Sequence, residues 1–253
     1  MNLETVSNLI PLKIKNNALY EKLSRSYIRY REEKVSQLYS DYETILNELH
    51  DTEKGNTCII MGTGPSLSKI DKSILKKYPV IGVNNSYKAY IPKYHVISDI
   101  HVLKRYNCEL QGIVDSTLIF LCSVAGLEYL NGGYKFCSVP IKTSSYMTTY
   151  MSLNLIDGIQ VADNVIVNAL QVAYHLGFEN VYLIGCDFDY GGDKEHFDGS
   201  KVSSQTHTYK TGDWSKIFHQ LEVCKDAYEL TGRNIYNATV GGKLEVFQRR
   251  SII

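Results

Sequence analysis

Apolar side chains recur every three or four positions between residues 16 and 50, and this stretch contains neither glycine nor proline. Such spacing predicts one long amphipathic helix, with Leu19 and Leu38 among its apolar positions. The polar, glycine-containing segment that follows ends it. We expect residues 1–56 to form a helical extension that packs on the rest of the chain or pairs with a second copy as a homo-oligomer. Peripheral membrane contact stays open, although a denser basic face is typical of such helices.

From residue 57 onward, short apolar runs alternate with stretches of helical period. The runs predict strands at 57–62, 79–86, 94–99, 116–123, 134–141, 180–190, 233–239 and 243–247, and the helical stretches lie at 66–78, 162–178 and 213–231. This alternation is typical of a mainly parallel twisted sheet with helices on both faces, so we expect a Rossmann-like α/β domain over residues 57–253. Residues 188–212 have no apolar period and predict a long loop, and loops of this length usually carry function.

The charge balance argues against a general attraction to nucleic acid. Lys and Arg together number 27, as do Asp and Glu, so the formal net charge is zero. A protein that binds a phosphate backbone needs a basic surplus. The 20 tyrosines, against 7 Phe and 1 Trp, supply flat amphipathic surface that suits sugar and nucleotide sites, although a low-GC genome accounts for most of such an excess.

Cysteine usage and hydropathy bear on the compartment. No run of about 18 apolar residues is present, and the first residues lack the basic and apolar regions of a secretory signal. The six cysteines are scattered through apolar segments without a CxxC pair, which favours buried thiols in a reducing compartment. We therefore expect a cytoplasmic protein, with the inner face of the membrane as the place of any peripheral contact.

Polar residues and glycines follow three successive predicted strands. Ligands of doubly wound sheets bind at the carboxyl ends of strands, so this arrangement predicts a nucleotide pocket. Paired glycines let the backbone approach a phosphate, and the helix expected to begin near Ser66 would supply N–H groups and a positive dipole end. A tight strand–helix turn capped by Ser66 is the plainer interpretation. The residues concerned are Gly62, Thr63, Gly64, Pro65, Ser66, Asn84, Asn85 and Asp99.

Two acidic residues, Asp187 and Asp189, end the strand at 180–190. Carboxylates at this spacing can hold a divalent metal that carries a diphosphate. In a metal-free arrangement, Asp187 would hold a ribose or position the loop, and Tyr190 would reach a phosphate. Such acidic pairs are short and common, so we expect no metal site, and Mg²⁺ enters only if the reaction is diphosphate transfer.

The long loop contributes the candidate general bases. A neutral imidazole can remove a proton from a sugar hydroxyl. His207, which precedes the last predicted helix, is the first candidate, and His196, close to Asp198, is the second. Either histidine is also compatible with a plain surface position. The turn at 237–243 can cap the same pocket or form a simple β-turn. Possible counter-charges for a phosphate or an acidic sugar are Lys210, Lys243, Arg249 and Arg250.

Three segments resemble a known group of proteins. CIIMGTGPSLSKID (58–71) resembles the opening motif of bacterial CMP-sialic-acid-dependent sialyltransferases, and LGFENVYLIGCDFDY (176–190) resembles their second hallmark. Together with NATVGGKLEVF (237–247), the same blocks are even more similar to the MptE-like superfamily. That group includes archaeal 6-hydroxymethylpterin pyrophosphokinases, flagellin-modifying nonulosonate transferases and proteins of glycan clusters. The resemblance covers roughly residues 57–247.

This resemblance implies roles for individual residues. The turn at 62–66 would bind the nucleotide and phosphate, Asn85 would contact base or sugar, and Asp187 would lie beside the ribose. His207 would be the catalytic base, and Tyr190 would replace a phosphate-binding tyrosine. Residues 158–168, GIQVADNVIVN, lack the Arg-x-x-Ser-Gly pattern of the sialyltransferases, so Asp163 and Asn164 would serve the nucleotide instead.

The leading hypothesis is an inverting glycosyltransferase that moves a sialic acid or a related acidic sugar from a CMP-activated donor to a glycan acceptor at the cell surface. A CMP-sugar carries one phosphate and would need no metal cofactor. One alternative is Mg²⁺-dependent diphosphate transfer of the 6-hydroxymethylpterin pyrophosphokinase type, at Asp187 and Asp189. Another is a non-catalytic protein that binds nucleotide sugars in a glycan pathway.

Overall fold

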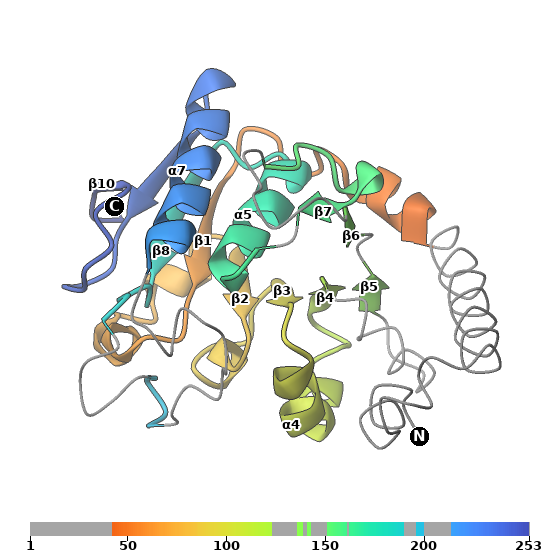
Figure 1. The fold of residues 1–253 in the computed structure, drawn as a ribbon. Coiled ribbons are helices and arrows are strands. Elements are labelled where there is room, and N and C mark those ends of the chain that lie inside the picture. The colour runs from red at the N-terminus through yellow and green to blue at the C-terminus, as the bar shows by residue number, and fades with distance from the viewer. Residues whose placement is uncertain are drawn as a thin grey trace, which may run out of the picture. The chain divides into compact units, whose positions relative to one another are not determined.

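A computed structural model describes residues 42–122, 136–138, 141–142, 151–160, 162–189, 196–199 and 214–252. Eight strands in these ranges form one sheet in the order β10-β9-β8-β1-β2-β3-β4-β5, and every neighbouring pair is parallel (Figure 1). The predicted Rossmann-like α/β class is thereby confirmed. The strands are β1 (Thr57–Met61), β2 (Val80–Val83), β3 (Tyr94–Ile97), β4 (Leu118–Leu121), β5 (Phe136–Ser138), β8 (Asn180–Ile184), β9 (Asn234–Asn237) and β10 (Gln248–Arg249).

Helices cover both faces of this sheet. The α-helices are α4 (Ile100–Gln111), α5 (Val165–Leu176) and α7 (Ser215–Leu230), and residues 42–49 are also helical. The 3-10 helices are η1 (Pro65–Lys69), η2 (Ile74–Lys76), η3 (Ser86–Lys88) and η5 (Leu155–Asp157). Two further strands, β6 (Ile141–Lys142) and β7 (Ile159–Gln160), form a separate parallel pair. None of the described helices is long and apolar enough to cross a membrane.

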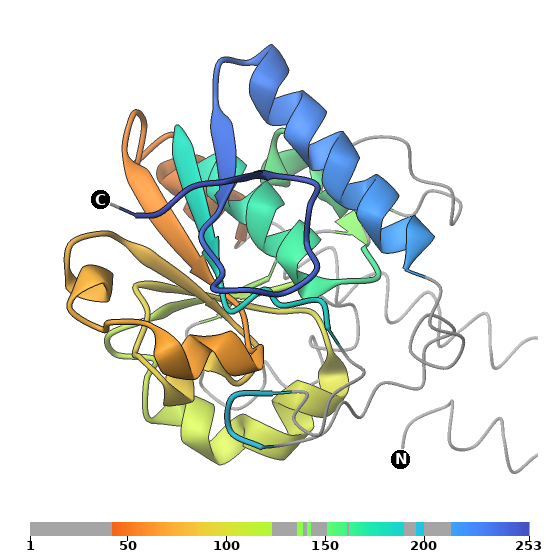
Figure 2. The ribbon, with the colours of Figure 1, turned by 90° about the vertical axis from the view of Figure 1, so that its left-hand side faces the viewer.

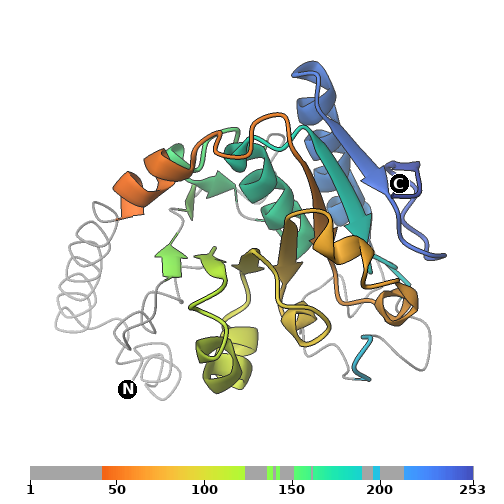
Figure 3. The ribbon, with the colours of Figure 1, turned by 180° about the vertical axis from the view of Figure 1, so that it is seen from behind.

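The central strands are buried on both sides because their apolar side chains alternate between two cores. Cys58 and Ile60 of β1 belong to the larger core, which α5 and α7 cover, whereas Ile59 and Met61 belong to a smaller core under η1 and η2. Figures 2 and 3 show α5 and α7 on one face and α4 on the other. All five residues of β1 are apolar or β-branched, as expected for a strand covered on both faces.

The compact unit that contains the sheet begins at Tyr42, ahead of the boundary predicted after residue 56. Leu46 of the 42–49 helix is fully buried in the larger core. The buried His175 of α5 fixes this helix, because its Nε2 donates to the Leu46 carbonyl (2.9 Å) while its Nδ1 accepts from the Leu155 N–H (3.2 Å). Residues 16–41 of the predicted long helix lie outside the described residues.

Two predictions about local structure are wrong, and one helix was not predicted. The helix predicted at 66–78 is replaced by η1 and η2, because Asp71 accepts hydrogen bonds from the N–H and the hydroxyl of Ser73 and thereby forms a turn. Helix α4, which Asp99 caps, was not expected from the apolar pattern. The predicted strand at 243–247 is not formed. Those residues instead lie in a turn that buries Leu244 and Phe247.

Candidate functional site

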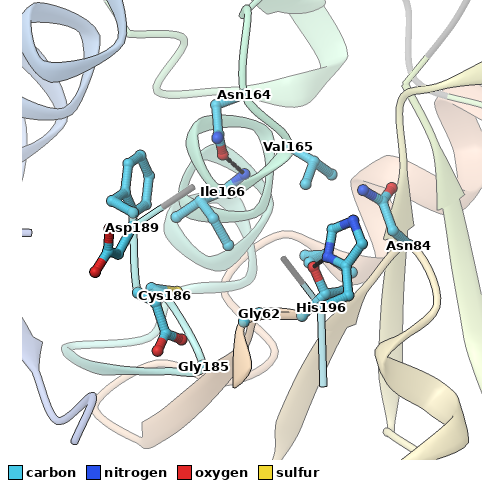
Figure 4. A pocket seen from close by; sticks show the side chains of 14 residues that line it. Gly62, Asn84, Asn164, Val165, Ile166, Gly185, Cys186, Asp189 and His196 are labelled. Atoms are coloured by element: carbon cyan, nitrogen blue, oxygen red, sulfur yellow. Dashed lines mark hydrogen bonds between the residues drawn. The ribbon is translucent and has the colours of Figure 1, made fainter. Parts of the chain in front are cut away.

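A pocket lies where the strand order reverses. From β1 the chain continues to β2 on one side of the sheet, and from β8 it continues to β9 on the other side. The connections that leave β1 and β8 therefore diverge, and doubly wound folds bind ligands in the crevice that this divergence leaves. The pocket is lined by Gly62, Thr63, Gly64, Val83, Asn84, Asn164, Val165, Ile166, Gly185, Cys186, Asp187, Phe188, Asp189 and His196 (Figure 4).

The glycines after β1 are required by the chain that follows β8. The N–H groups of Gly62 and Gly64 donate to the carbonyls of Ile184 and Gly185, both at 2.8 Å, and so continue the pairing of β1 with β8. A Cβ atom on Gly62 would lie 2.4 Å from the Gly185 carbonyl oxygen, and one on Gly64 would lie 2.8 Å from the same oxygen. The two glycines thus allow a close approach of two backbone segments at the floor of the pocket.

Asp187 joins the same two segments through a side chain. Its Oδ1 accepts from the Ser66 N–H (3.2 Å) and its Oδ2 accepts from the Ser66 hydroxyl (2.7 Å). Ser66 does not cap a helix by its side chain as predicted, because Gly64 occupies the N-cap position of η1. Both carboxylate oxygens of Asp187 are therefore already hydrogen-bonded on the side that faces η1.

The segment 196–199 brings a histidine from the long loop to the pocket. His196 Nδ1 lies 3.0 Å from the Thr63 hydroxyl, and the Phe197 N–H donates to the Thr63 carbonyl (2.9 Å). Two residues further along, Asp198 accepts from the Asn85 side-chain amide (2.7 Å). These contacts hold His196 over the ends of β1 and β2. His207 and Tyr190 lie outside the described residues, and their roles remain predictions.

The amino end of α5 forms another wall of the pocket. Asn164 caps the helix, since its Oδ1 accepts from the Ile166 N–H (2.8 Å, dashed in Figure 4). Val165 and Ile166 line the pocket, so the positive end of the helix dipole faces it. Asp163 turns toward α7 instead, where its Oδ2 lies 2.6 Å from Lys216 Nζ.

Two strained residues line the pocket. Among the described residues, the non-glycine positions with positive φ are Asp51, Asn84 (+50°) and Phe188 (+49°). Asn84 and Phe188 belong to the lining, and such strain concentrates at functional sites. Phe188 is held by ring contacts with Phe218 and Trp214, whose centroids lie 5.9 Å and 6.5 Å away.

Asn84 is held by a buried histidine. Its carbonyl accepts from His95 Nε2 at 2.8 Å, and burial lowers the pKa of His95 to about 4, so this imidazole is neutral near pH 7. The Asn84 side-chain oxygen is buried and has no hydrogen-bond partner among the described residues. A buried acceptor without a partner costs free energy unless a ligand or water supplies a donor. Asn84 therefore lines the pocket with an amide oxygen whose hydrogen bond a ligand or a water can supply.

The acidic residues do not form a metal site by themselves. Asp187 is hydrogen-bonded to Ser66, and Asp189 Oδ1 lies 2.9 Å from Lys243 Nζ. Within the part of the chain that the structure describes, no three His, Cys, Asp or Glu side chains are close enough together to hold an ion. The carboxylates at 187 and 189 therefore do not fit a metal held by protein ligands alone.

The predicted site residues divide into two groups. The lining includes Gly62, Thr63, Gly64, Asn84, Asn164, Asp187 and His196. Outside it lie Pro65 and Ser66 in η1, Asn85 bonded to Asp198, Asp99 at the cap of α4, and Asp163. Lining residues that sequence reasoning missed are Val83, Val165, Ile166, Gly185, Cys186 and Phe188. Those at 185, 186 and 188 lie next to Asp187 near the carboxyl end of the strand predicted at 180–190, and this position was the available signal.

Comparison with known proteins identifies the family. No curated protein matches the chain. A family model described as "6-hydroxymethylpterin diphosphokinase MptE-like" matches residues 33–193, which include β1, β8 and every residue of the pocket lining except His196. This match spans more than half of the chain, and the predicted relationship to the MptE-like group is confirmed. The chain belongs to the MptE-like family.

Proposed function

We propose that this protein is a transferase that binds a nucleoside triphosphate in the pocket at the carboxyl ends of β1 and β8 and transfers its terminal diphosphate to the hydroxymethyl group of a pterin or a related heterocycle. The observation that carries the proposal is the match to a family described by 6-hydroxymethylpterin diphosphokinase. The matched residues include all of the pocket lining except His196. The family's description favours diphosphate transfer over sugar transfer from a CMP-linked donor.

The walls of the pocket suit a phosphate-bearing ligand. The amino end of α5 directs a positive dipole end at the pocket, and helix termini of this kind bind phosphate. The Asn84 amide oxygen suits an N–H or O–H donor of a heterocycle or ribose. Phe188, Val165 and Ile166 supply apolar surface for the flat part of such a ligand.

The chemistry requires removal of one proton. The hydroxyl oxygen of the acceptor would form a bond to the β-phosphorus. The bond from that phosphorus to the oxygen that bridges it to the α-phosphorus would break, and the nucleoside monophosphate would leave with that oxygen. His196 can take the hydroxyl proton at Nε2 when its Nδ1 carries the hydrogen and donates to the Thr63 hydroxyl. Thr63 would then be the group that orients the base. No step of this scheme passes through a metal held by Asp187 and Asp189.

Transfer of an acidic sugar from a CMP-activated donor is the second candidate. The observation that favours it is the engagement of Asp187 with Ser66 and of Asp189 with Lys243, because a CMP-sugar needs no metal partner. The same base, His196, would act on an acceptor hydroxyl of a glycan.

Thermal unfolding with a panel of CMP, CDP, UDP, GDP and ATP, each with and without Mg²⁺, tests the proposal. A ligand at a hundredfold excess over its Kd stabilises the native state by about 2.7 kcal/mol. We expect ATP to raise the Tm and, with 6-hydroxymethyl-dihydropterin, to yield AMP. A shift with CMP alone, followed by CMP release from a CMP-linked nonulosonate, would favour the second candidate. Tight nucleotide binding without turnover of any acceptor would indicate a non-catalytic binding protein.

A further inference from the structure

The turn at 237–250, which lies beyond the family match, is fastened to the rim of the pocket. The Lys243 N–H donates to the Asp187 carbonyl (2.7 Å), and the Thr239 hydroxyl accepts from the Cys186 N–H (3.2 Å). Gly242 has a φ of +77°, and a Cβ atom there would lie 2.6 Å from the Asp187 carbonyl oxygen. The backbone of the turn therefore contacts the segment that follows β8 as closely as glycine permits.

Arg249 braces this turn from within. Its guanidinium donates to the carbonyls of Gly241 (2.8 Å), Thr239 (3.2 Å) and Gly242 (3.1 Å), and it also pairs with Glu245 (2.7 Å). Such a planar fork fixes several acceptors at once. The Cα atom of Lys243 is consequently held in a defined place beside the pocket, and only its side chain retains wide freedom.

That side chain ends at the pocket lining. Lys243 Nζ lies 2.9 Å from Asp189 Oδ1, and the two side chains are 69% and 45% exposed. Ion pairs at this exposure contribute only about 0–1 kcal/mol, so the ammonium group can leave Asp189 at little cost. A phosphate, with its higher charge, is a stronger partner for the same group.

The described charges of the pocket favour a role for this cation in phosphate binding. Among the described residues, the lining contains Asp187 and Asp189 but neither lysine nor arginine. From these described residues, a di- or triphosphate would meet two carboxylates and the positive end of the α5 dipole. We propose that Lys243 is a phosphate-binding residue of this pocket, that Asp189 is its counter-ion in the empty state, and that the pyrophosphate portion of the ligand binds on the Asp189 side. Figure 4 shows Asp189 and His196 on opposite sides of the pocket, which leaves the His196 side for the acceptor.

This inference rests on the proposal that a phosphorylated ligand binds here, and it does not depend on the acceptor. Calorimetric titration of the full chain with inorganic pyrophosphate and with ATP, without and with Mg²⁺, tests it. We expect Lys243→Gln to weaken metal-free pyrophosphate binding by about tenfold, as loss of one charged hydrogen bond would. Lys243→Arg should bind nearly as wild type. Asp189→Asn should bind more tightly, because it removes the competing carboxylate.

Lys216→Gln is the matched control. Lys216 also pairs with an aspartate, Asp163, but that aspartate does not line the pocket, so pyrophosphate affinity should stay unchanged. Equal affinity of Lys243→Gln and wild type would overturn the inference while the proposed function stands. Loss of Mg²⁺-dependent binding in Asp189→Asn, with metal-free binding unchanged, would also overturn it and would make Asp189 a metal ligand. If wild type binds neither pyrophosphate nor any nucleotide, the proposed function fails as well.

Discussion

Asp187 accepts two hydrogen bonds from Ser66, one from its N–H and one from its hydroxyl, although the two residues are 121 positions apart in the chain. The carboxylate that follows β8 thereby closes the loop that follows β1. Ser66 is almost fully buried, so its hydroxyl depends on this partner. The geometry makes Asp187 a structural residue of the pocket floor.

Ser66→Ala should lower the free energy of unfolding by about 1–3 kcal/mol, since a hydrogen bond to a charged group is lost at a buried site. Urea denaturation measures this change. Ser68→Ala is the control, because Ser68 bonds the Pro65 carbonyl at an exposed position. If Ser66→Ala and Asp187→Ala both unfold like wild type yet abolish nucleotide binding, Asp187 contacts ligand instead of supporting the loop.

Gly62→Ala should destabilise the fold by about 1–3 kcal/mol or more, because its Cβ would meet the Gly185 backbone carbonyl. Gly112→Ala offers a matched comparison. Its φ of −69° suits any residue, and its Cβ would lie 3.3 Å from the Glu109 carbonyl oxygen. Thermal unfolding of the two variants should show a much larger loss of Tm at position 62, and equal losses would contradict the close approach of β1 and β8.

Asn84→Gly separates backbone strain from side-chain chemistry. Glycine tolerates a φ of +50°, so stability should change by less than about 1 kcal/mol. The unpartnered amide oxygen is lost, and we expect nucleotide or acceptor affinity to fall by about tenfold. Titration calorimetry beside urea unfolding would reveal both effects. Unchanged affinity for the donor and for the acceptor would show that Asn84 supports the backbone conformation and that its side chain does not contact either ligand.

His196→Gln should reduce turnover by about 10²- to 10⁴-fold with little effect on donor affinity, as loss of a general base does. His219→Gln serves as the control, because His219 is exposed on α7 beside Glu222. Single-turnover rates and donor titrations would be compared. Turnover that persists in His196→Gln and disappears in His207→Gln would assign the base to His207.

Stability should fall as the pH falls from about 6.5 to about 4 because of His95. In the unfolded chain a histidine binds a proton below about pH 6.5, whereas burial lowers the pKa of folded His95 to about 4. Within this window the unfolded state binds more protons, and the loss amounts to on the order of 3 kcal/mol. Urea titrations across the window would show a shallower pH dependence for His95→Gln. If the free energy of unfolding of His95→Gln depends on pH as steeply as that of wild type, groups other than His95 cause the loss of stability.

The sequence predicted those features that depend on neighbouring residues. Short apolar runs identified β1 and β8, and a helical period identified α5. The glycines and polar residues at strand ends identified Gly62, Asn84 and Asp187 as members of one pocket. Strand ends of a parallel sheet share an edge, so this inference needs no long-range information.

Contacts between distant segments could not be predicted in the same way. His196 reaches Thr63 across 133 positions, and no local period marks which histidine of a long loop does so. The left-handed conformation of Phe188 follows from its packing on Phe218 and Trp214, and a bulky residue rarely adopts it by preference. The turn at Asp71 interrupted a helical period because a side-chain hydrogen bond competed with the backbone.

The parallel pairing of β1 with β8 also bears on biosynthesis. Every residue of β1 pairs with a residue of β8, and β1 leaves the ribosome more than a hundred residues earlier. At the usual rates of synthesis this interval lasts on the order of ten seconds, during which the apolar β1 has no partner on that side. An unpaired apolar strand on a nascent chain favours aggregation during this interval. The pocket, which both strands build, is completed only after the second of them has been translated.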